Sequence, residues 1–243
     1  TSNYEEPLLF KDNGGVTIGA ITGLLFGLHP LHVESVAWIA ERKDLLCALF
    51  FLLSVFFYSN YIEIIKNKST GNDSSSRFLL YRKYLLSLGC FILALLSKPM
   101  AITLPIVLLI FDYHPFNRIH SFQDLRGVFV EKIPFFLCSI GSSILTYLAQ
   151  QSGNAIWEGV PFSIRVLVAT KSILAYLWNM LLPLDLLPFY PYPREASFWS
   201  LEYIGTLFLV IGVTLFCVYI SKRQRLWLTV LAYYIVTLLP VLG

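Results

Sequence analysis

Residues 45–65 read LLCALFFLLSVFFYSNYIEII, a long apolar run near the start of the chain. No charged side chain occurs between Leu45 and Ile62. The run has the length of roughly 20 residues that an α-helix needs to cross the hydrocarbon of a bilayer. It ends close to Tyr58 and Tyr61, and tyrosine is typical of the membrane–water interface. The segment therefore predicts a membrane-spanning helix.

The composition of the whole chain supports this prediction. Of 243 residues, 56% are hydrophobic and 14% are charged, and the mean hydropathy is +0.67. A soluble domain carries about 25% charged residues, because its surface faces water. The net charge is only +3, and the basic residues lie in clusters between apolar runs. We therefore expect no nucleic-acid partner. The four cysteines all lie in apolar runs, where they are interpreted as small buried hydrophobic residues.

Similar apolar runs predict one all-α domain, a polytopic transmembrane helix bundle. The predicted spans are 16–28, 45–65, 84–97, 102–111, 133–151, 201–220 and 226–242, with a polar loop at 66–83. Lysine and arginine are in excess in 66–83 and in 221–225, which places both segments on the cytoplasmic side. We therefore expect residues 29–44 and 190–194 on the extracytoplasmic side, in a bacterial inner membrane or, in a eukaryote, the endoplasmic reticulum membrane.

Two segments leave the topology open. Residues 84–111 are interrupted by Lys98 and Pro99, so they form either a helical hairpin or one kinked helix. Residues 162–182 carry Arg165 and Lys171 within apolar sequence, so they either cross the membrane or lie along its surface. The two cytoplasmic segments require an even number of crossings between them. This requirement and the two cations favour a surface position for 162–182.

The densest polar stretch, residues 29–44, reads HPLHVESVAWIAERKD. His29 and His32 would share one helix face, but Glu34 would point away, and the spacing differs from the zinc motif H-E-x-x-H. We therefore predict no metal site. A polar site that works through hydrogen bonds or acid–base chemistry is favoured, and a capped loop with solvated charges is the alternative. Arg42 and Lys43 suit an anionic group at a membrane surface.

Further candidates come from other segments. Lys98 lies between apolar runs, where a cation is a functional-site hypothesis by default, and in a hairpin it would lie near residues 29–44 and help hold a phosphate. Asp112 is interpreted as a cytoplasmic helix stop and interface anchor. Gln150 and Gln151 end a span on the extracytoplasmic side. The remaining candidates are Tyr190 and Tyr192, which serve either as membrane anchors or as contacts for a sugar or an isoprenoid.

These motifs resemble a known family. The run 29–44 is similar to the signature of bacterial membrane proteins that carry tetratricopeptide repeats, which are related to the eukaryotic transmembrane-and-tetratricopeptide-repeat protein O-mannosyltransferases. Later segments match in order: LSKPM at 96–100, FDY at 111–113, EKIPFF at 131–136 with AQQSG at 149–153, and FYPYP at 189–193.

The resemblance implies a C-type glycosyltransferase membrane fold and a transferase that moves a sugar, expected to be mannose, from a polyprenyl-phosphate carrier to protein Ser or Thr. It implies that Glu34 lies near the reacting centre, with His32 and His29 beside it. It implies a binding set for the substrate and the carrier phosphate: Arg42, Lys43, Lys98, Gln150, Gln151, Arg165, Tyr190 and Tyr192. Expected partners are membrane lipids, the sugar donor, an acceptor protein and other membrane subunits; no cofactor beyond the donor is implied.

The chain also departs from the family pattern. The family's first span and its acidic catalytic loop would precede Thr1, and its tetratricopeptide repeats would follow Gly243, so we expect the central part of a longer protein. A non-catalytic membrane subunit that binds a lipid or a partner is the alternative function. A transporter is a third hypothesis, because intramembrane lysine and broken helices suit one, but no internal repeat supports it.

Overall fold

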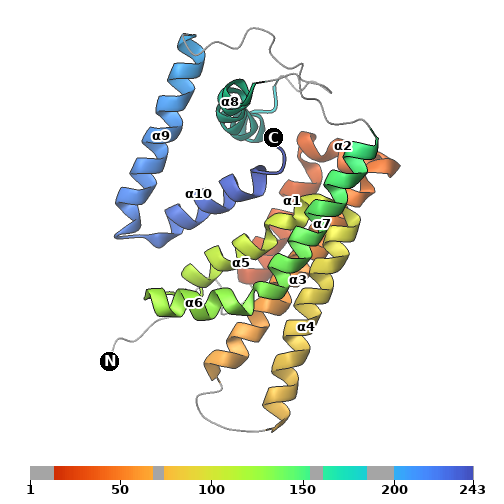
Figure 1. Cartoon of the computed structure of the whole chain (residues 1–243). Coiled ribbons are helices and arrows are strands. Elements are labelled where there is room, and N and C mark those ends of the chain that lie inside the picture. Colours follow the sequence, from red (N-terminus) through yellow and green to blue (C-terminus); the bar gives the residue numbers. More distant parts are fainter. Residues whose placement is uncertain (1–13, 68–73, 154–160, 185–199, 243) are drawn as a thin grey trace.

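The computed structural model describes residues 14–67, 74–153, 161–184 and 200–242, and within these ranges the chain is helical and has no strand (Figure 1). The elements in chain order are α1 (Gly14–Leu28), η2 (Pro30–His32), α2 (Val33–Ala37), η3 (Ile39–Glu41), α3 (Arg42–Asn67), α4 (Ser74–Ser97), η5 (Pro99–Thr103), α5 (Leu104–Tyr113), α6 (Phe122–Glu131), α7 (Ile133–Ser152), α8 (Phe162–Leu181), α9 (Leu201–Ser221) and α10 (Arg225–Leu238).

The centre of the bundle is the antiparallel pair α3 and α4. Ser54 and Ser87 face each other between the two helices, and each hydroxyl donates to the other residue's carbonyl at 2.8 Å. Small residues let helices approach closely, and interhelical hydrogen bonds replace water in an apolar setting. Tyr58, Phe91 and Phe135, all fully buried, extend the core toward α7.

Residues 84–111 form a hairpin, which decides between the two arrangements left open by the sequence. Lys98 is extended, with φ −154° and ψ 128°, and Pro99 opens the next helical turn. Lys98 pairs with Asp44 near the start of α3, whereas Asp112 pairs with Tyr58 further along the same helix. Asp44 and Tyr58 are as far apart in the sequence as their partners Lys98 and Asp112, so the two segments run in the same direction. α5 therefore runs alongside α3 and antiparallel to α4.

The other helices surround this hairpin. α7 runs parallel to α4, since Tyr84 donates to the Glu131 carbonyl and Phe91 contacts Phe135. α10 packs on α5, where Phe111 and Tyr233 stack at 6.0 Å. α8 is seen nearly end-on in Figure 1, whereas α3, α4 and α7 are seen from the side, so α8 lies across the direction of the bundle. The surface position expected for residues 162–182 stays a prediction, since this helix is also long and apolar enough to cross a membrane.

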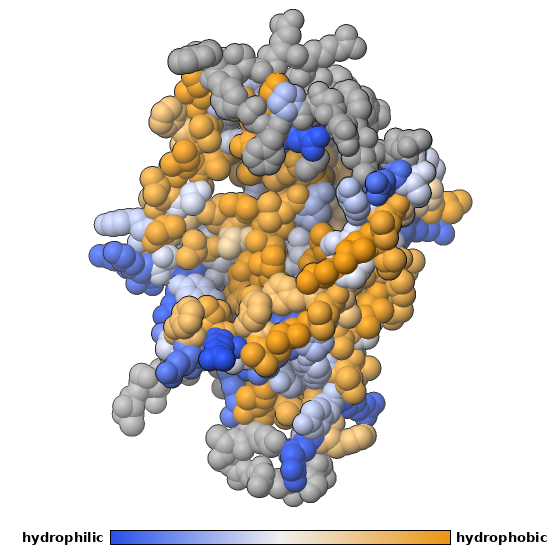
Figure 2. Space-filling model, in the orientation of Figure 1, coloured by the Kyte–Doolittle hydropathy of each residue, from blue (hydrophilic) through white to orange (hydrophobic). Residues whose placement is uncertain are grey.

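Within the described ranges, five helices are long and apolar enough to cross a membrane: Ile39–Lys66, Arg77–Ser97, Ile133–Ser152, Ile164–Leu181 and Tyr203–Ser221. The count rises to six if α1 and Pro30–Ala37, bent by 64° at their junction, form one broken span. The segments expected at 102–111 and 226–242 correspond to shorter apolar helices, Pro99–Tyr113 and Arg225–Leu238. The large apolar surface in Figure 2 fits contact with lipid.

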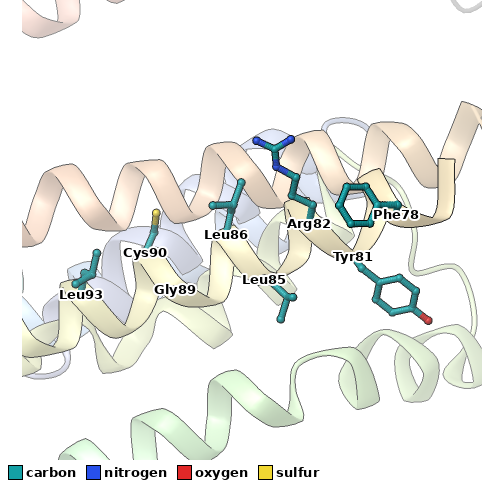
Figure 3. A pocket seen from close by; sticks show the side chains of 8 residues that line it. All are labelled: Phe78, Tyr81, Arg82, Leu85, Leu86, Gly89, Cys90 and Leu93. Atoms are coloured by element: carbon teal, nitrogen blue, oxygen red, sulfur yellow. The ribbon is translucent and has the colours of Figure 1, made fainter. Parts of the chain in front are cut away.

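An open apolar hollow follows one face of α4 (Figure 3). Its lining comes from this helix alone and contains a single charged residue, Arg82. None of the candidate site residues lines it. Its composition is that of a helix surface exposed to lipid.

Two stretches differ from the expected organisation. α4 begins at Ser74, ten residues before the expected span, so the loop expected at 66–83 is helical from residue 74 onward. The polar residues at the start of α4 extend the helix beyond the apolar run, and the hydropathy pattern does not mark where the helix starts. The polar stretch before residue 133 contains α6, an additional helix whose N-terminus is capped by Ser121.

Candidate functional site

Residues 30–41 form the three short helices η2, α2 and η3, which precede α3 in the chain, and residues 42–44 are the first of α3. Pro30 suits the first position of η2, and the Leu31 amide donates to His29 Nδ1 at 3.2 Å. His29 Nε2 lies 2.9 Å from the Met180 carbonyl, so a tautomer with its proton on Nε2 satisfies both contacts. The histidine therefore fastens this segment to the end of α8.

His32 packs beside His29. Its ring lies 4.0 Å from the Phe26 ring and 6.0 Å from the His29 ring, between centroids. His32 Nδ1 is enclosed and has no hydrogen-bond partner among the described residues. No group of three metal-ligating side chains forms anywhere in the described ranges. In this arrangement the His32 ring packs on Phe26, and the His29 ring forms hydrogen bonds.

Asp44 and Lys98 join the start of α3 to the tip of the α4–α5 hairpin. Lys98 Nζ lies 2.6 Å from Asp44 Oδ1, and both side chains are about a quarter exposed, at 27% and 28%. Cys47 Sγ adds a weak contact to the Lys98 carbonyl at 3.8 Å. The expected proximity of Lys98 to residues 29–44 is thus a direct ion pair. An ammonium has three donors, so two remain for another acceptor.

Two charged groups of this segment are exposed and unpaired among the described residues: the Glu34 carboxylate and the Arg42 guanidinium. Lys43, in contrast, pairs with Glu41 at 3.2 Å. We call Glu34, Arg42, Asp44 and Lys98 the polar end. It combines a carboxylate on α2 that can accept a proton with cations on α3 and at the hairpin tip that can hold an anion, and α2 packs against α3.

The other predicted site residues divide into three groups. Gln150 and Gln151 are exposed at the end of α7 that points the same way as the polar end (Figure 1). Arg165 lies near the start of α8, whereas His29 contacts Met180 near the end of α8. The two positions are about 22 Å apart along the helix, so this contact does not place Arg165 beside His29. Tyr190 and Tyr192 lie outside the described residues.

A second polar cluster lies about 21 Å along α3 from Asp44, and sequence reasoning missed it. Asp112, interpreted as an interface anchor, is instead fully buried. Its carboxylate contacts Lys132 Nζ at 2.5 Å, the Tyr58 hydroxyl at 2.8 Å and Arg118 at 3.1 Å. Arg118 also forms a two-pronged pair with Glu131 at 2.8 and 2.9 Å. We call these five residues the buried ionic network.

The buried ionic network is electrically balanced, with two carboxylates and two cations. Burial lowers the pKa of the Lys132 ammonium, and the nearby Asp112 carboxylate opposes that effect. Burial also lowers the pKa of Arg118, but its bonds to Glu131 more than offset this, and the net shift is upward. Because all charges are paired, the network is suited to holding helices together. The sequence signal for this network is a pair of opposite charges, Asp112 near the end of α5 and Lys132 directly after α6.

The fold and its polar end define a class: a polytopic α-helical membrane protein with a mixed-charge surface at one end of the bundle. The chain is similar to proteins named protein O-mannosyl-transferases. It is 42% identical to TMTC4 of Mus musculus over 105 residues, 34% identical to tmtc2 of Xenopus laevis over 129 residues and 32% identical to TMTC2 of Homo sapiens over 139 residues.

These similarities cover 43%, 50% and 57% of this chain and 13%, 13% and 16% of the respective relatives. The chain thus spans a small part of the length of the curated relatives it matches. No protein-family model matches it. No solved structure matches it either.

Proposed function

We propose that this chain is the central membrane portion of a protein O-mannosyltransferase, which transfers mannose from a polyprenyl-phosphate carrier to protein Ser or Thr on the extracytoplasmic side. The carrying observation is the polar end: Lys98 pairs with Asp44 beside the segment that carries the Glu34 carboxylate and the Arg42 guanidinium, in a chain whose relatives bear that name. The proposal includes a C-type glycosyltransferase fold and residence in the endoplasmic reticulum or bacterial inner membrane.

The proposed chemistry divides the polar end into two roles. The acceptor hydroxyl oxygen attacks the anomeric carbon of the sugar, while the bond from that carbon to the phosphate oxygen breaks and its electron pair leaves with the phosphate. Glu34 accepts the hydroxyl proton, with His29 and His32 orienting the segment that carries it. Cations nearby stabilise the negative charge that develops on the leaving phosphate.

Lys98 and Arg42 are the proposed phosphate ligands. Asp44 occupies one donor of Lys98 and fixes its direction, which leaves two donors for phosphate oxygens. Arg42 offers a planar fork suited to two oxygens. Lys43, Gln150, Gln151 and Arg165 complete the proposed binding set within the described residues. Tyr190 and Tyr192 are proposed for the sugar or the isoprenoid chain.

The test is sugar transfer by the full-length protein from polyprenyl-phosphate mannose to an acceptor peptide. Glu34→Gln removes the proposed base with little change in shape, and we expect the transfer rate to fall by about a hundredfold or more. Glu41→Gln is the matched control in the same segment. It removes the carboxylate that pairs with Lys43 in a partly exposed contact, so its rate should stay within about threefold of wild type. Equal rates for both variants would remove Glu34 from the reaction.

The alternative is a non-catalytic membrane subunit with the same fold. That alternative would be supported if the full-length wild-type protein and both variants bind polyprenyl phosphate but transfer no sugar. Loss of binding together with loss of transfer in Lys98→Gln would support the transferase.

A further inference from the structure

α6 is joined to α7 in a way that restricts where it can lie. α6 ends at Glu131 and α7 begins at Ile133, with only Lys132 between them. Pro134, near the start of α7, has no amide hydrogen, and its ring would clash with the Val130 carbonyl in a continuous helix. The chain therefore turns at Lys132, and Figure 1 shows α6 lying across the lower end of α7. α6 must stay at the level where this candidate span begins.

Neighbouring side chains have the composition of a membrane–water interface at that level. The Tyr84 hydroxyl of α4 donates to the Glu131 carbonyl at 2.7 Å, and the Tyr84 ring contacts Tyr61 of α3 at 5.4 Å. Lys83 directly precedes Tyr84, and its Nζ lies 5.5 Å from the centroid of the Phe57 ring. Tyrosine and lysine together are enriched where hydrocarbon meets water. α6 thus lies at an interface level.

α6 presents different chemistry on its different sides. Val128 is 5% exposed and faces the bundle, and Glu131 is engaged by Arg118. Phe122 and Phe129 are 84% and 46% exposed, and with Leu125 they recur at a spacing that places them on one helix face. A ten-residue helix about 15 Å long therefore carries an exposed apolar face beside its bundle contact.

This apolar face continues onto the outer surface of α7. The Phe129 ring stacks on Phe136 at 5.1 Å between centroids, and Ile133 and Leu137 are exposed beyond it. Since α7 is a candidate span, the residues exposed on its outside meet lipid. The apolar face of α6 is continuous with this lipid-facing surface of α7. We therefore assign the bilayer, and not a protein partner, as what covers the apolar face of α6.

We propose that α6 lies in the plane of the membrane surface, with Phe122, Leu125 and Phe129 among the upper acyl chains of a phospholipid bilayer. The capping box of Ser121 and Asp124 starts the helix, and the pair of Arg118 with Glu131 holds its end against the bundle. This arrangement makes α6 an anchor that sets the depth of α7.

The experiment measures the surroundings of α6 with single spin labels on the full chain in phosphatidylcholine nanodiscs. Labels replace Phe122, Leu125 and Phe129 on the apolar face, and Gln123 and Gly127 as controls on the opposite face. Gly127 has open space around it, so a side chain fits there. The native cysteines are first replaced by alanine: Cys47, Cys90, Cys138 and Cys217. Variants are compared only if their circular dichroism matches that of the unlabelled chain.

On the apolar face we expect collisions with oxygen, which dissolves in lipid, to exceed collisions with a water-soluble nickel chelate several-fold. At 123 and 127 we expect the reverse. Nickel collisions that dominate at all five positions would overturn the proposal, because α6 would then be in water. Low collisions with both reagents at 122 and 129 would also overturn it, because protein would then cover the face.

Discussion

Replacing Lys132 with methionine tests whether the buried ionic network holds the bundle together. Methionine keeps most of the volume but removes the charge, which contacts Asp112 at 2.5 Å, the Tyr58 hydroxyl at 2.7 Å and the Val128 carbonyl at 3.2 Å. Lys132 and Asp112 are both fully buried. Removing one partner of such a pair costs about 3–5 kcal/mol, because the other charge stays buried. Arg118 still contacts Asp112 at 3.1 Å, so we expect a loss near 3 kcal/mol.

The assay is a denaturant titration of the full chain in micelles, which gives the free energy of unfolding. Lys43→Met is the matched control, since Lys43 is half-exposed and pairs only with Glu41 at the surface. Its effect should stay below about 0.5 kcal/mol. The double variant Asp112→Asn/Lys132→Met should lose less than the sum of the two single variants, by about 1 kcal/mol or more, because neither buried charge is then left alone.

Two results would refute this reasoning. Lys132→Met within about 1 kcal/mol of wild type would mean that water or lipid headgroups already compensate the Asp112 charge. Single effects that simply add in the double variant would mean that the two groups do not act as a pair.

Lys98→Gln should weaken binding of polyprenyl phosphate about tenfold in a titration, whereas Lys43→Gln should change it less. Ser121→Ala should lower the hydrogen-exchange protection of α6 amides about fivefold; unchanged protection would argue against the cap. Hydrogen bonds from Ser121 and the His120 amide hold the pKa of Asp124 below its usual range. The stability from Asp124 is therefore present above its ordinary pKa and lost as pH falls through the lowered one; Asp124→Asn should abolish this pH dependence of α6 exchange. Single cysteines at Lys43 and Arg223 should react with an impermeant maleimide from opposite sides of sealed vesicles, and reaction from one side would contradict the topology.

Local sequence predicts most of the helices, and it also contains the signals of α6, which we did not predict. The long helices follow apolar runs, because hydrophobicity over about twenty residues is a property of the segment itself. α6 lies in a stretch whose charges suggest a loop, yet Ser121 and Asp124 form a capping pattern, and Phe122, Leu125 and Phe129 follow at helical spacing. This local pattern is that of a short capped helix.

The candidate site was only partly accessible from sequence. The density of polar residues at 29–44 marked the segment, because charges between apolar runs are conspicuous. The pairing of Asp44 with Lys98 depended on whether the chain reverses at Pro99, and a proline permits either a kink or a turn. Asp112 looked like a helix stop because it ends an apolar run, and its partners Tyr58 and Lys132 are distant in sequence.

The residues from Leu45 onward already determined that this protein is helical and lies in a membrane, since the cost of moving each segment out of lipid depends on its own side chains. Tertiary structure decided the hairpin at Lys98, the ion pair that joins it to Asp44 and the buried ionic network around Asp112. The physical reason is that a charge within an apolar bundle must find its partner in space. Which partner it finds depends on how the helices pack.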